Sequence, residues 1–165
     1  MAKWGKADFS ELKALQEKLL DMDDKADEFY RAAAKELAGR LLNLVIPDTP
    51  LGVYPVSSGK KGGTLRRGWT AKSHEEAETG SGTPNAAQAR AYAQSLPVKR
   101  ISGGYVIDVI NPVEYASYVE FGHRTVNGGF VKGQFFLTNA EVILDGEKDS
   151  FLQKKLYQYL KDKLG

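Results

Sequence analysis

The sequence predicts an α+β fold in which a small antiparallel β-sheet packs against long N-terminal helices. Apolar residues recur at helical spacing near both ends of the chain, within residues 8–46 and 135–164. Between these regions, two short β-rich runs flank Ser102-Gly103-Gly104, which is typical of an antiparallel hairpin. Terminal helices around central strands indicate an α+β arrangement, and a length of 165 residues suits a single domain.

Two helices are predicted over residues 8–46. Asp8 and Ser10 are suitable N-cap residues for the first helix, and the acidic stretch Asp21–Asp24 separates it from the second. The second helix should end by Ile46, because Pro47 has no backbone N–H to donate. The apolar positions that form the two stripes are Phe9, Leu12, Leu15, Leu19, Leu20, Phe29, Tyr30, Ala33, Ala34, Leu37, Leu41 and Leu44.

A loop-rich β region is predicted over residues 47–110. It begins with a linker over residues 47–63, where prolines and glycines disfavour both a helix and a central strand. Alternating apolar and polar positions from Leu65 to Ala71 predict a half-buried strand. The polar, acidic run His74–Asn85 is expected to be mobile, whereas Ala86–Ser95 has the composition for one or two helical turns.

The end of this region is the predicted hairpin. Val98–Ile101 and Tyr105–Ile110 supply its two strands, and the three residues between them are short enough for a tight connection. In the second strand, side chains two residues apart share one face. Those on the apolar face are Tyr105, Ile107 and Val109.

A short helix is predicted over residues 112–122. Asn111 offers a side-chain acceptor at the N-cap, Pro112 suits the first helical position, and Glu114 stands at the third. Gly122 is placed where a helix often ends in a left-handed residue. An apolar stripe at helical spacing more often packs into its own core than against a partner. The stripe consists of Tyr115, Tyr118 and Val119, and the same core packing is favoured for Phe121.

The remaining residues are predicted as a loop and two C-terminal helices. The loop covers residues 123–134 and contains three glycines, and the helices share residues 135–164. The last helix carries its own apolar stripe. That stripe consists of Phe151, Leu152, Leu156, Tyr159 and Leu160.

Composition excludes several classes of function. A net charge of +2 lacks the strong basic balance of a dedicated nucleic-acid binder, and the absence of cysteine excludes disulfides and thiolate metal sites. No run of about 18 apolar residues indicates a membrane span or a secretion signal. Two histidines without a carboxylate pattern predict no metal site, and no motif predicts a cofactor or a catalytic residue.

Three stretches resemble the tail-completion, or head-tail joining, proteins of tailed bacteriophages and phage-derived tail-like particles. The most specific is YASYVEFG, from Tyr115 to Gly122, which continues as far as Arg124. The others are IPDTP with GTLRRGW, between Ile46 and Trp69, and GGFVKGQFFLTNA, from Gly128 to Ala140. Residues 52–62 and 73–96 fit the family only as insertions.

The resemblance implies a non-enzymatic structural subunit of the virion, made in the cytoplasm of the host bacterium. Such a subunit would assemble with itself, typically as a hexameric ring, on the head-proximal end of the tail, and would help to join tail to head. Its other partners would be connector or neck proteins and tail tube or terminator proteins, with no membrane contact. A closed ring requires a heterologous interface, which uses two different surfaces of each copy.

Two groups of residues are candidates for contacts. Aromatic and charged side chains around the short helix and the following loop could touch a neighbouring subunit, although an exposed ion pair contributes little. These candidates are Tyr118, Glu120, Phe121, His123, Arg124 and Phe130. A basic patch could meet genomic DNA in the lumen of a ring without sequence preference. The patch consists of Lys60, Lys61, Arg66, Arg67 and Lys72.

Three alternative functions remain open at this point. The chain could be a tail terminator, which is hard to separate from a tail-completion protein by sequence. It could instead be a small nucleic-acid-binding module that uses the basic patch around Trp69. An enzyme is the third alternative, since catalytic groups can converge from distant positions without a recognisable spacing.

Overall fold

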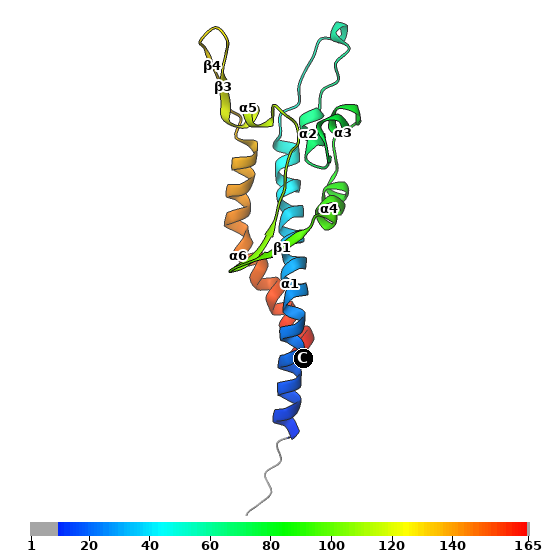
Figure 1. Cartoon of the computed structure of the whole chain (residues 1–165), viewed down its shortest axis with the longest axis vertical. Helices are drawn as coiled ribbons and strands as arrows, with labels where there is room; N and C mark the ends of the chain where they lie inside the picture. Colours follow the sequence, from blue (N-terminus) through cyan, green and yellow to red (C-terminus); the bar gives the residue numbers. More distant parts are fainter. Residues whose placement is uncertain (1–9, 165) are drawn as a thin grey trace, which may run out of the picture.

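Two long antiparallel helices determine the elongated shape of the molecule (Figure 1). The computed structural model describes residues 10–164, in which α1 (Ser10–Asp48) and α6 (Phe136–Leu164) run side by side. An ion pair joins Lys155 to Glu36 at 2.7 Å, and the Arg40 guanidinium lies 4.1 Å from the centre of the Phe151 ring. From Glu36 to Arg40 the chain advances along α1, whereas their partners on α6 go back from Lys155 to Phe151, so the two helices run in opposite directions.

The helix α1 is a single element of 39 residues, so the prediction of two helices was wrong. The acidic stretch contains no glycine or proline, and Asp21 forms an i,i+4 ion pair with Lys25 that suits a continuous helix. The helix also runs two residues past Ile46, with Pro47 inside its last turn. The predicted start at residue 8 lies outside the described residues.

The helix α6 is likewise one element of 29 residues, where two helices were predicted. Gly146 lies inside it with open space around the position of a side chain. A glycine within a helix costs about 1 kcal/mol relative to alanine, which is too little to break a helix packed along α1. None of the described helices is long and apolar enough to cross a membrane.

The segment predicted as a strand from Leu65 to Ala71 is helical instead. It forms α2 (Thr64–Gly68), and Leu65 and Trp69 are both buried. These two residues are four apart, so they share a face in a helix just as they do in a strand. The indole Nε1 of Trp69 donates a hydrogen bond of 2.8 Å to Thr49 Oγ1 and thereby ties α2 to the end of α1.

The polar run expected to be mobile also contains a short helix, α3 (His74–Thr79). Ser73 caps it by accepting a hydrogen bond of 3.2 Å from the backbone N–H of Glu76. The helical turns predicted over Ala86–Ser95 are confirmed as α4. A capping box between Asn85 and Gln88 begins α4, which packs along α1.

The predicted hairpin is confirmed and lies against α1, although its second strand ends at Ile107 and not at Ile110 as predicted. Its strands, β1 (Val98–Ile101) and β2 (Gly104–Ile107), pair antiparallel. Tyr105 stacks on Tyr30 of α1 with ring centres 5.3 Å apart. A second antiparallel pair, β3 (Gly122–Arg124) and β4 (Phe130–Lys132), occupies the segment predicted as a loop. Two small antiparallel sheets beside long helices confirm the α+β class.

The short helix α5 (Ala116–Phe121) begins four residues later than predicted. Asn111 does not cap it: its Nδ2 donates to the Leu65 carbonyl oxygen at 2.8 Å, and its Oδ1 accepts from the backbone N–H of Val113 at 3.2 Å. The side chain therefore joins this segment to α2. The predicted end at Gly122 is confirmed, with a φ of +83° that favours glycine.

The core lies in the half of the molecule that contains the C-terminal part of α1. There α1, α2 and α4 meet the first turns of α6 around fully buried side chains. The Trp69 ring meets the Phe136 ring edge-on, with centres 6.2 Å apart. The largest fully buried side chains are Phe136, Leu42, Val45 and Thr49.

Candidate interaction surface

The β3–β4 hairpin is mounted on the junction between α5 and α6. At that junction the buried carboxylate of Glu120 accepts hydrogen bonds of 2.9 Å from the backbone N–H groups of Leu137 and Thr138, and one of 2.6 Å from Thr138 Oγ1. The N-terminus of a helix leaves backbone donors unpaired and carries a partial positive charge. Glu120 therefore caps α6 from a neighbouring element.

Close backbone contacts then fix the root of the hairpin. The N–H of Gln134 donates to the Val119 carbonyl oxygen at 2.8 Å, and that of Phe135 donates to the Glu120 carbonyl oxygen at 3.1 Å. A side chain on Gly133 would lie 2.2 Å from that same Glu120 oxygen, so only glycine fits. Phe135 has a φ of +53°, a left-handed conformation that is unfavourable for a bulky residue. This strained residue is the last one before α6, where the chain passes from the hairpin into the helix.

The hairpin presents apolar side chains to solvent. Its turn is closed by a hydrogen bond from the N–H of Thr125 to the Gly129 carbonyl oxygen at 2.8 Å. Phe130 is 68% exposed, Val126 at the turn is fully exposed, and Phe121 at the end of α5 is 61% exposed. Single exposed apolar residues are ordinary, but a group of them on one projecting element indicates an interaction site.

The structure divides the six residues predicted to touch a partner. Tyr118, Phe121 and Phe130 are exposed. Core packing was therefore the wrong interpretation of Tyr118 and Phe121, and also of Tyr115, which is 37% exposed, whereas Val119 does pack against the core. His123 and Arg124 are exposed on β3, where the His123 ring lies 5.7 Å from that of Tyr118. Glu120 was wrongly placed at the surface, because its carboxylate is buried and fully used in capping α6.

The two arginines of the predicted basic patch bind backbone carbonyl oxygens, and Arg67 is buried while Arg66 is partly exposed. The guanidinium of Arg66 donates to the carbonyl oxygens of Thr49 and Pro47 at 2.6 and 3.0 Å, where α1 ends. Arg67 is 8% exposed, and its guanidinium donates to the Ala77 carbonyl oxygen at 2.6 Å. Further acceptors of Arg67 are the Gly62 and Gly82 carbonyl oxygens and Thr64 Oγ1. Both arginines organise the backbone of the chain.

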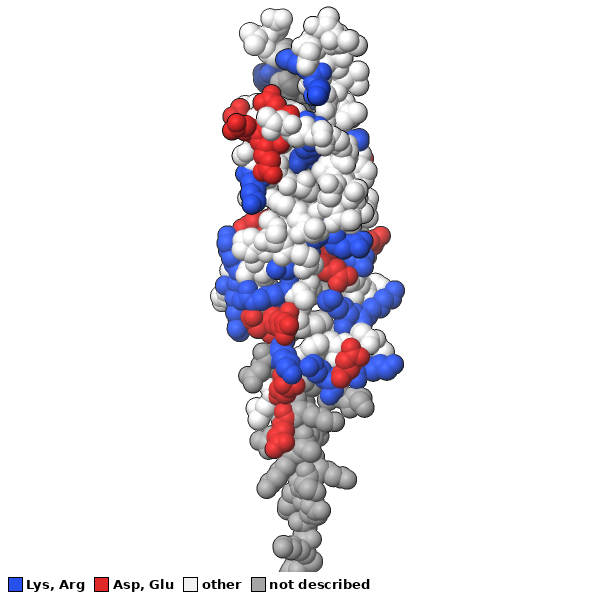
Figure 2. Space-filling model, turned by 90° about the vertical axis from the view of Figure 1, so that its right-hand side faces the viewer, with Lys and Arg blue, Asp and Glu red and all other residues white. Residues whose placement is uncertain are grey.

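The lysines of the patch are exposed but lie close to acidic residues. Lys60 and Lys61 line a pocket together with Glu78, and the backbone N–H of Lys72 donates to Glu76 at 2.7 Å. Figure 2 shows this acidic cluster just below the basic side chains at the upper end of the molecule. Nearby carboxylates reduce the attraction of a basic patch for phosphates.

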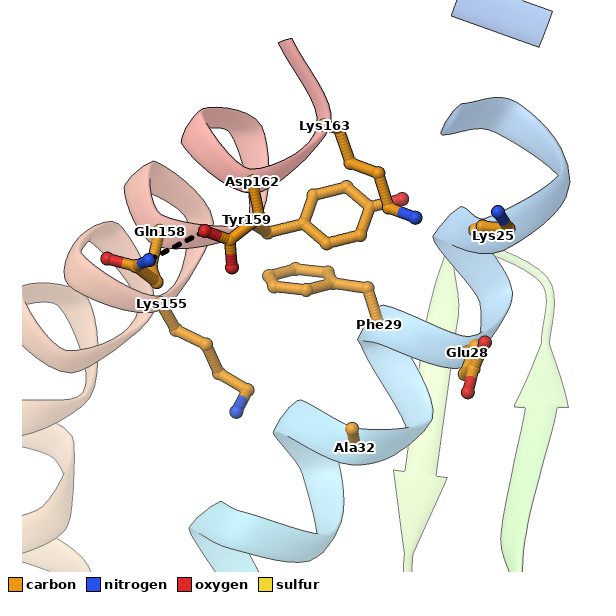
Figure 3. Close-up of a pocket in the computed structure, with 9 residues that line it drawn as sticks. All are labelled: Lys25, Glu28, Phe29, Ala32, Lys155, Gln158, Tyr159, Asp162 and Lys163. Atoms are coloured by element: carbon orange, nitrogen blue, oxygen red, sulfur yellow. Dashed lines mark hydrogen bonds between the residues drawn. The ribbon is translucent and has the colours of Figure 1, made fainter. Parts of the chain in front are cut away.

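A crevice between the far ends of α1 and α6 is the other notable hollow (Figure 3). It encloses about 320 Å³, and its lining includes the rings of Phe29 and Tyr159, which pack against each other with centres 4.8 Å apart. The cations at its rim already have carboxylate partners: Lys25 and Lys163 approach Asp21, and Lys155 approaches Glu36. These contacts are those of two helices packing together.

In the part of the chain that the structure describes, no group of three or more His, Asp or Glu side chains is arranged to hold a metal ion. His74 Nδ1 accepts a hydrogen bond of 3.4 Å from the backbone N–H of Glu114, and its ring lies edge-on to Tyr115. These contacts give His74 a structural role between α3 and the segment that precedes α5.

Sequence reasoning missed the hairpin, although one signal for it was present. Asn127-Gly128 lies between Val126 and the apolar pair Phe130-Val131, and an Asn-Gly dipeptide flanked by apolar residues is a strong hairpin signal. Gly128 has the positive φ, +82°, that such a turn requires. The exposed pair Val142 and Ile143 on α6 was also missed. Apolar residues in a helical sequence do not show whether another element of the fold covers them.

Comparison with known proteins gives one match. A model of the family described as "Bacteriophage HK97-gp10, putative tail-component" matches residues 13–122, which is about two thirds of the chain. The matched region runs from α1 through α5 and ends at Gly122, the first residue of the hairpin. No curated protein and no solved structure matches the chain.

Proposed function

This chain belongs to the HK97-gp10-like family of bacteriophage tail components, and from that membership we propose that it is a head-tail joining subunit. The resemblance carried by Tyr115–Gly122 is confirmed at the level of the family, which supports a structural role in a phage tail. The finer proposal is a ring of identical copies on the head-proximal end of the tail. We take this subunit to be non-enzymatic and to be part of the virion.

The projecting hairpin is the observation that carries the proposal. A subunit that joins two assemblies needs a firm body and an exposed element that reaches a neighbour. Here the body is the antiparallel pair α1 and α6, and the hairpin root is fixed to it by Glu120 and Gly133. The exposed Phe130 and Val126 supply apolar area of the kind found in protein interfaces.

The proposed partners are copies of this chain, with six as the expected number, and the neck and tail proteins on either side. The hairpin and the loop between Pro50 and Gly63 both project from one end of the molecule (Figure 1). This loop exposes Val53 and Val56 almost completely. An end that carries two projecting apolar segments is suited to contacts with the proteins above or below a ring.

The test is a phage or prophage in which the gene for this chain is deleted, examined by electron microscopy. Filled heads and complete tails that accumulate unjoined are the expected result, and expression of the wild-type chain should restore joined particles. Tails of abnormal length would instead favour a tail terminator, because a terminator limits the growth of the tube. Normal joined particles would overturn the proposal.

Non-specific contact with the genome is a second candidate, supported by the exposed Lys60 and Lys61. Because Arg66 and Arg67 bind backbone carbonyls, their loss would not test it. The informative variant is Lys60→Ala/Lys61→Ala/Lys72→Ala, compared with the wild-type assembly in a DNA-binding assay at low salt. Binding that falls and loses salt dependence in this variant would support DNA contact. Failure of the wild-type assembly to bind DNA would refute it.

A further inference from the structure

The β3–β4 hairpin is basic as well as apolar. From Phe121 to Phe135 the sequence contains Arg124, Lys132 and one histidine, and it contains no acidic residue. Both cations are exposed, and neither forms an ion pair within the described part of the chain. Phe130 pairs with Arg124 across the two strands, so a partner that meets this charge also covers an exposed aromatic ring.

The first turns of α6, which follow the hairpin, carry the opposite charge. From Phe136 to Glu147 the sequence has three acidic residues and no lysine or arginine. All three acidic residues are exposed, although Asp145 is paired with Lys148. The hairpin and α6 form one side of the molecule, the hairpin edge (Figure 1). This edge is basic at its upper level and acidic below.

The opposite side, the α3–α4 edge, has the reverse order of charge. From Ser73 to Ala89 the sequence contains three exposed glutamates and no lysine or arginine, whereas the next 18 residues contain three exposed cations and no acidic residue. Figure 2 views this side and shows an acidic cluster near the upper end, with basic side chains gathering across the middle. The residues are Glu75, Glu76 and Glu78, then Arg90, Lys99 and Arg100.

At the upper level of this edge, Glu75 and Glu78 are the carboxylates available to a partner. They are three residues apart and therefore lie on one side of α3. The side chain of Glu78 is 70% exposed, and its ion-pair contact is the imidazole at the first residue of α3, 4.0 Å away. Lys60 and Lys61 line a pocket with Glu78 but lie beyond ion-pair distance of it. Glu76 instead accepts a backbone hydrogen bond of 2.7 Å just before α3.

At the middle level, Arg90 is the cation available to a partner. It is exposed on α4 and forms no ion pair among the described residues. Lys99 is already paired with Asp108 at 2.8 Å, and Arg100 lies 3.9 Å from Asp27. These two cations therefore contribute less to a contact than Arg90 does.

The two edges match level by level. In Figure 1, α3 lies at the height of α5, which supports the hairpin, and α4 lies at the height of the first turns of α6. A second copy placed beside the first in the same orientation therefore meets opposite charges at both levels. A copy shifted along the long axis would place the hairpin beside α4, where both are basic. Two identical edges would place one hairpin on another.

We propose that neighbouring copies stand side by side in the same orientation, with the β3–β4 hairpin of one copy on α3 of the next, an inference that rests on the proposed ring. Arg124 and Lys132 approach Glu75 and Glu78, and the acidic start of α6 meets Arg90 of α4. Opposite charges at two levels identify a second copy as the partner. The contact joins two different edges, so it is heterologous, as a closing ring requires.

Charge reversal tests this contact. Arg124→Glu/Lys132→Glu makes the hairpin acidic, and Glu75→Lys/Glu78→Lys makes α3 basic while Glu76 keeps its hydrogen bond. Each double variant should self-associate at least about tenfold more weakly than the wild type by sedimentation velocity, because like charges then meet. A chain with all four substitutions should recover association. An equal mixture of the two double variants should also recover it, because opposite charges meet at every contact of an alternating ring. Such a ring closes only with an even number of copies.

Cross-linking tests which edges meet. The chain has no cysteine, so Arg124→Cys and Glu75→Cys each introduce its only thiol. A mixture of the two single variants should form disulfide-linked dimers under mild oxidation, and each variant alone should form far fewer. Efficient dimer formation by Arg124→Cys alone would show that hairpins meet each other and would overturn the proposal.

A matched control is Lys154→Glu/Lys161→Glu, which changes the net charge as much as the hairpin variant does. These exposed lysines lie on the far half of α6, so association should stay unchanged. Circular dichroism establishes that each variant remains folded. The contact is refuted if either double variant associates as the wild type does, or if the folded quadruple variant fails to recover. A wild-type chain that stays monomeric also refutes it, because the hairpin then meets a different protein.

The gene deletion separates this inference from the proposed function. If heads and tails join normally without the chain, the joining role fails whatever the association measurements give. If joining requires the chain but charge reversal leaves association intact, the role stands and only the contact between the two edges fails.

Discussion

Thr138 and Glu120, which are 18 residues apart, form a two-point contact in which the backbone N–H and the hydroxyl of Thr138 both donate to Oε1 of Glu120. The two bonds measure 2.9 and 2.6 Å. Because the carboxylate belongs to α5 and the donors to α6, this contact fixes the angle at which the hairpin leaves the body. Glu120 thus both caps α6 and holds the β3–β4 hairpin in position relative to the two long helices.

Removing this carboxylate should destabilise the fold. Glu120→Ala should lower the free energy of unfolding by about 2 kcal/mol, because the loss of an N-cap costs ~0.5–2 kcal/mol and hydrogen bonds to a charged group contribute ~1.5–3 kcal/mol. Glu120→Gln keeps one acceptor oxygen and should cost less. Urea denaturation measures both variants, and an Ala variant as stable as the wild type would contradict the capping role.

The hairpin root should be intolerant of a single added methyl group. Gly133→Ala places a Cβ 2.2 Å from the Glu120 carbonyl oxygen, and such overpacking costs ~1–3 kcal/mol. Gly146→Ala on α6 is the matched control, since its Cβ meets open space and alanine favours a helix by about 1 kcal/mol. Thermal unfolding should therefore show opposite shifts of Tm for the two substitutions. A neutral Gly133→Ala would show that the root adapts.

Arg67 should behave as a structural residue and not as part of a charged surface. Arg67→Ala leaves the buried Ala77 carbonyl oxygen without its donor and should cost about 3 kcal/mol. Arg67→Lys should recover only part of this, because an ammonium lacks the planar fork of a guanidinium. Hydrogen exchange should become faster in α3. Lys61 is exposed, so Lys61→Ala should change the free energy of unfolding by less than ~0.5 kcal/mol. If Arg67→Ala and Lys61→Ala lost the same amount of stability, the structural role of Arg67 would be refuted.

Stability should fall in acid partly through Asp27. The hydrogen bond from Arg31, at 2.6 Å, and that from Tyr105 hold the pKa of Asp27 below its ordinary value of 3.8. A depressed folded-state pKa contributes stability that is present above pH 3.8 and is lost as the pH falls through the lower value. Asp27→Asn should therefore lose less stability than the wild type between pH 5 and about pH 3, as measured by denaturant unfolding.

The sequence predicted the elements whose signals are local. The composition of Ala86–Ser95 predicted the helical turns of α4, and Ser102-Gly103-Gly104 predicted the connection of the β1–β2 hairpin. Each of these signals is contained in a short segment of the chain. The class of fold followed from such elements together with the apolar stripes of the two long helices.

Errors arose where one pattern fits two structures. Leu65 and Trp69 occupy one side of either a strand or a helix, and the backbone hydrogen bond of 3.0 Å from Arg67 to the Gly63 carbonyl oxygen shows that the segment is a helix. Glu120 was assigned to the surface because a glutamate usually lies there, and its partners on α6 are not visible from local sequence. The exposure of Val142 on α6 could not be predicted, since it depends on how two distant helices meet.

The unbroken length of α1 has a mechanical consequence. At 1.5 Å per residue, a helix of 39 residues extends roughly 58 Å, and its one proline stands in the final turn. The element therefore behaves as a stiff beam over most of the molecule. If copies stand parallel in an assembly, the length of this beam sets the least height that the assembly can have, whatever the number of copies. Electron microscopy of the assembled particle would measure that height directly.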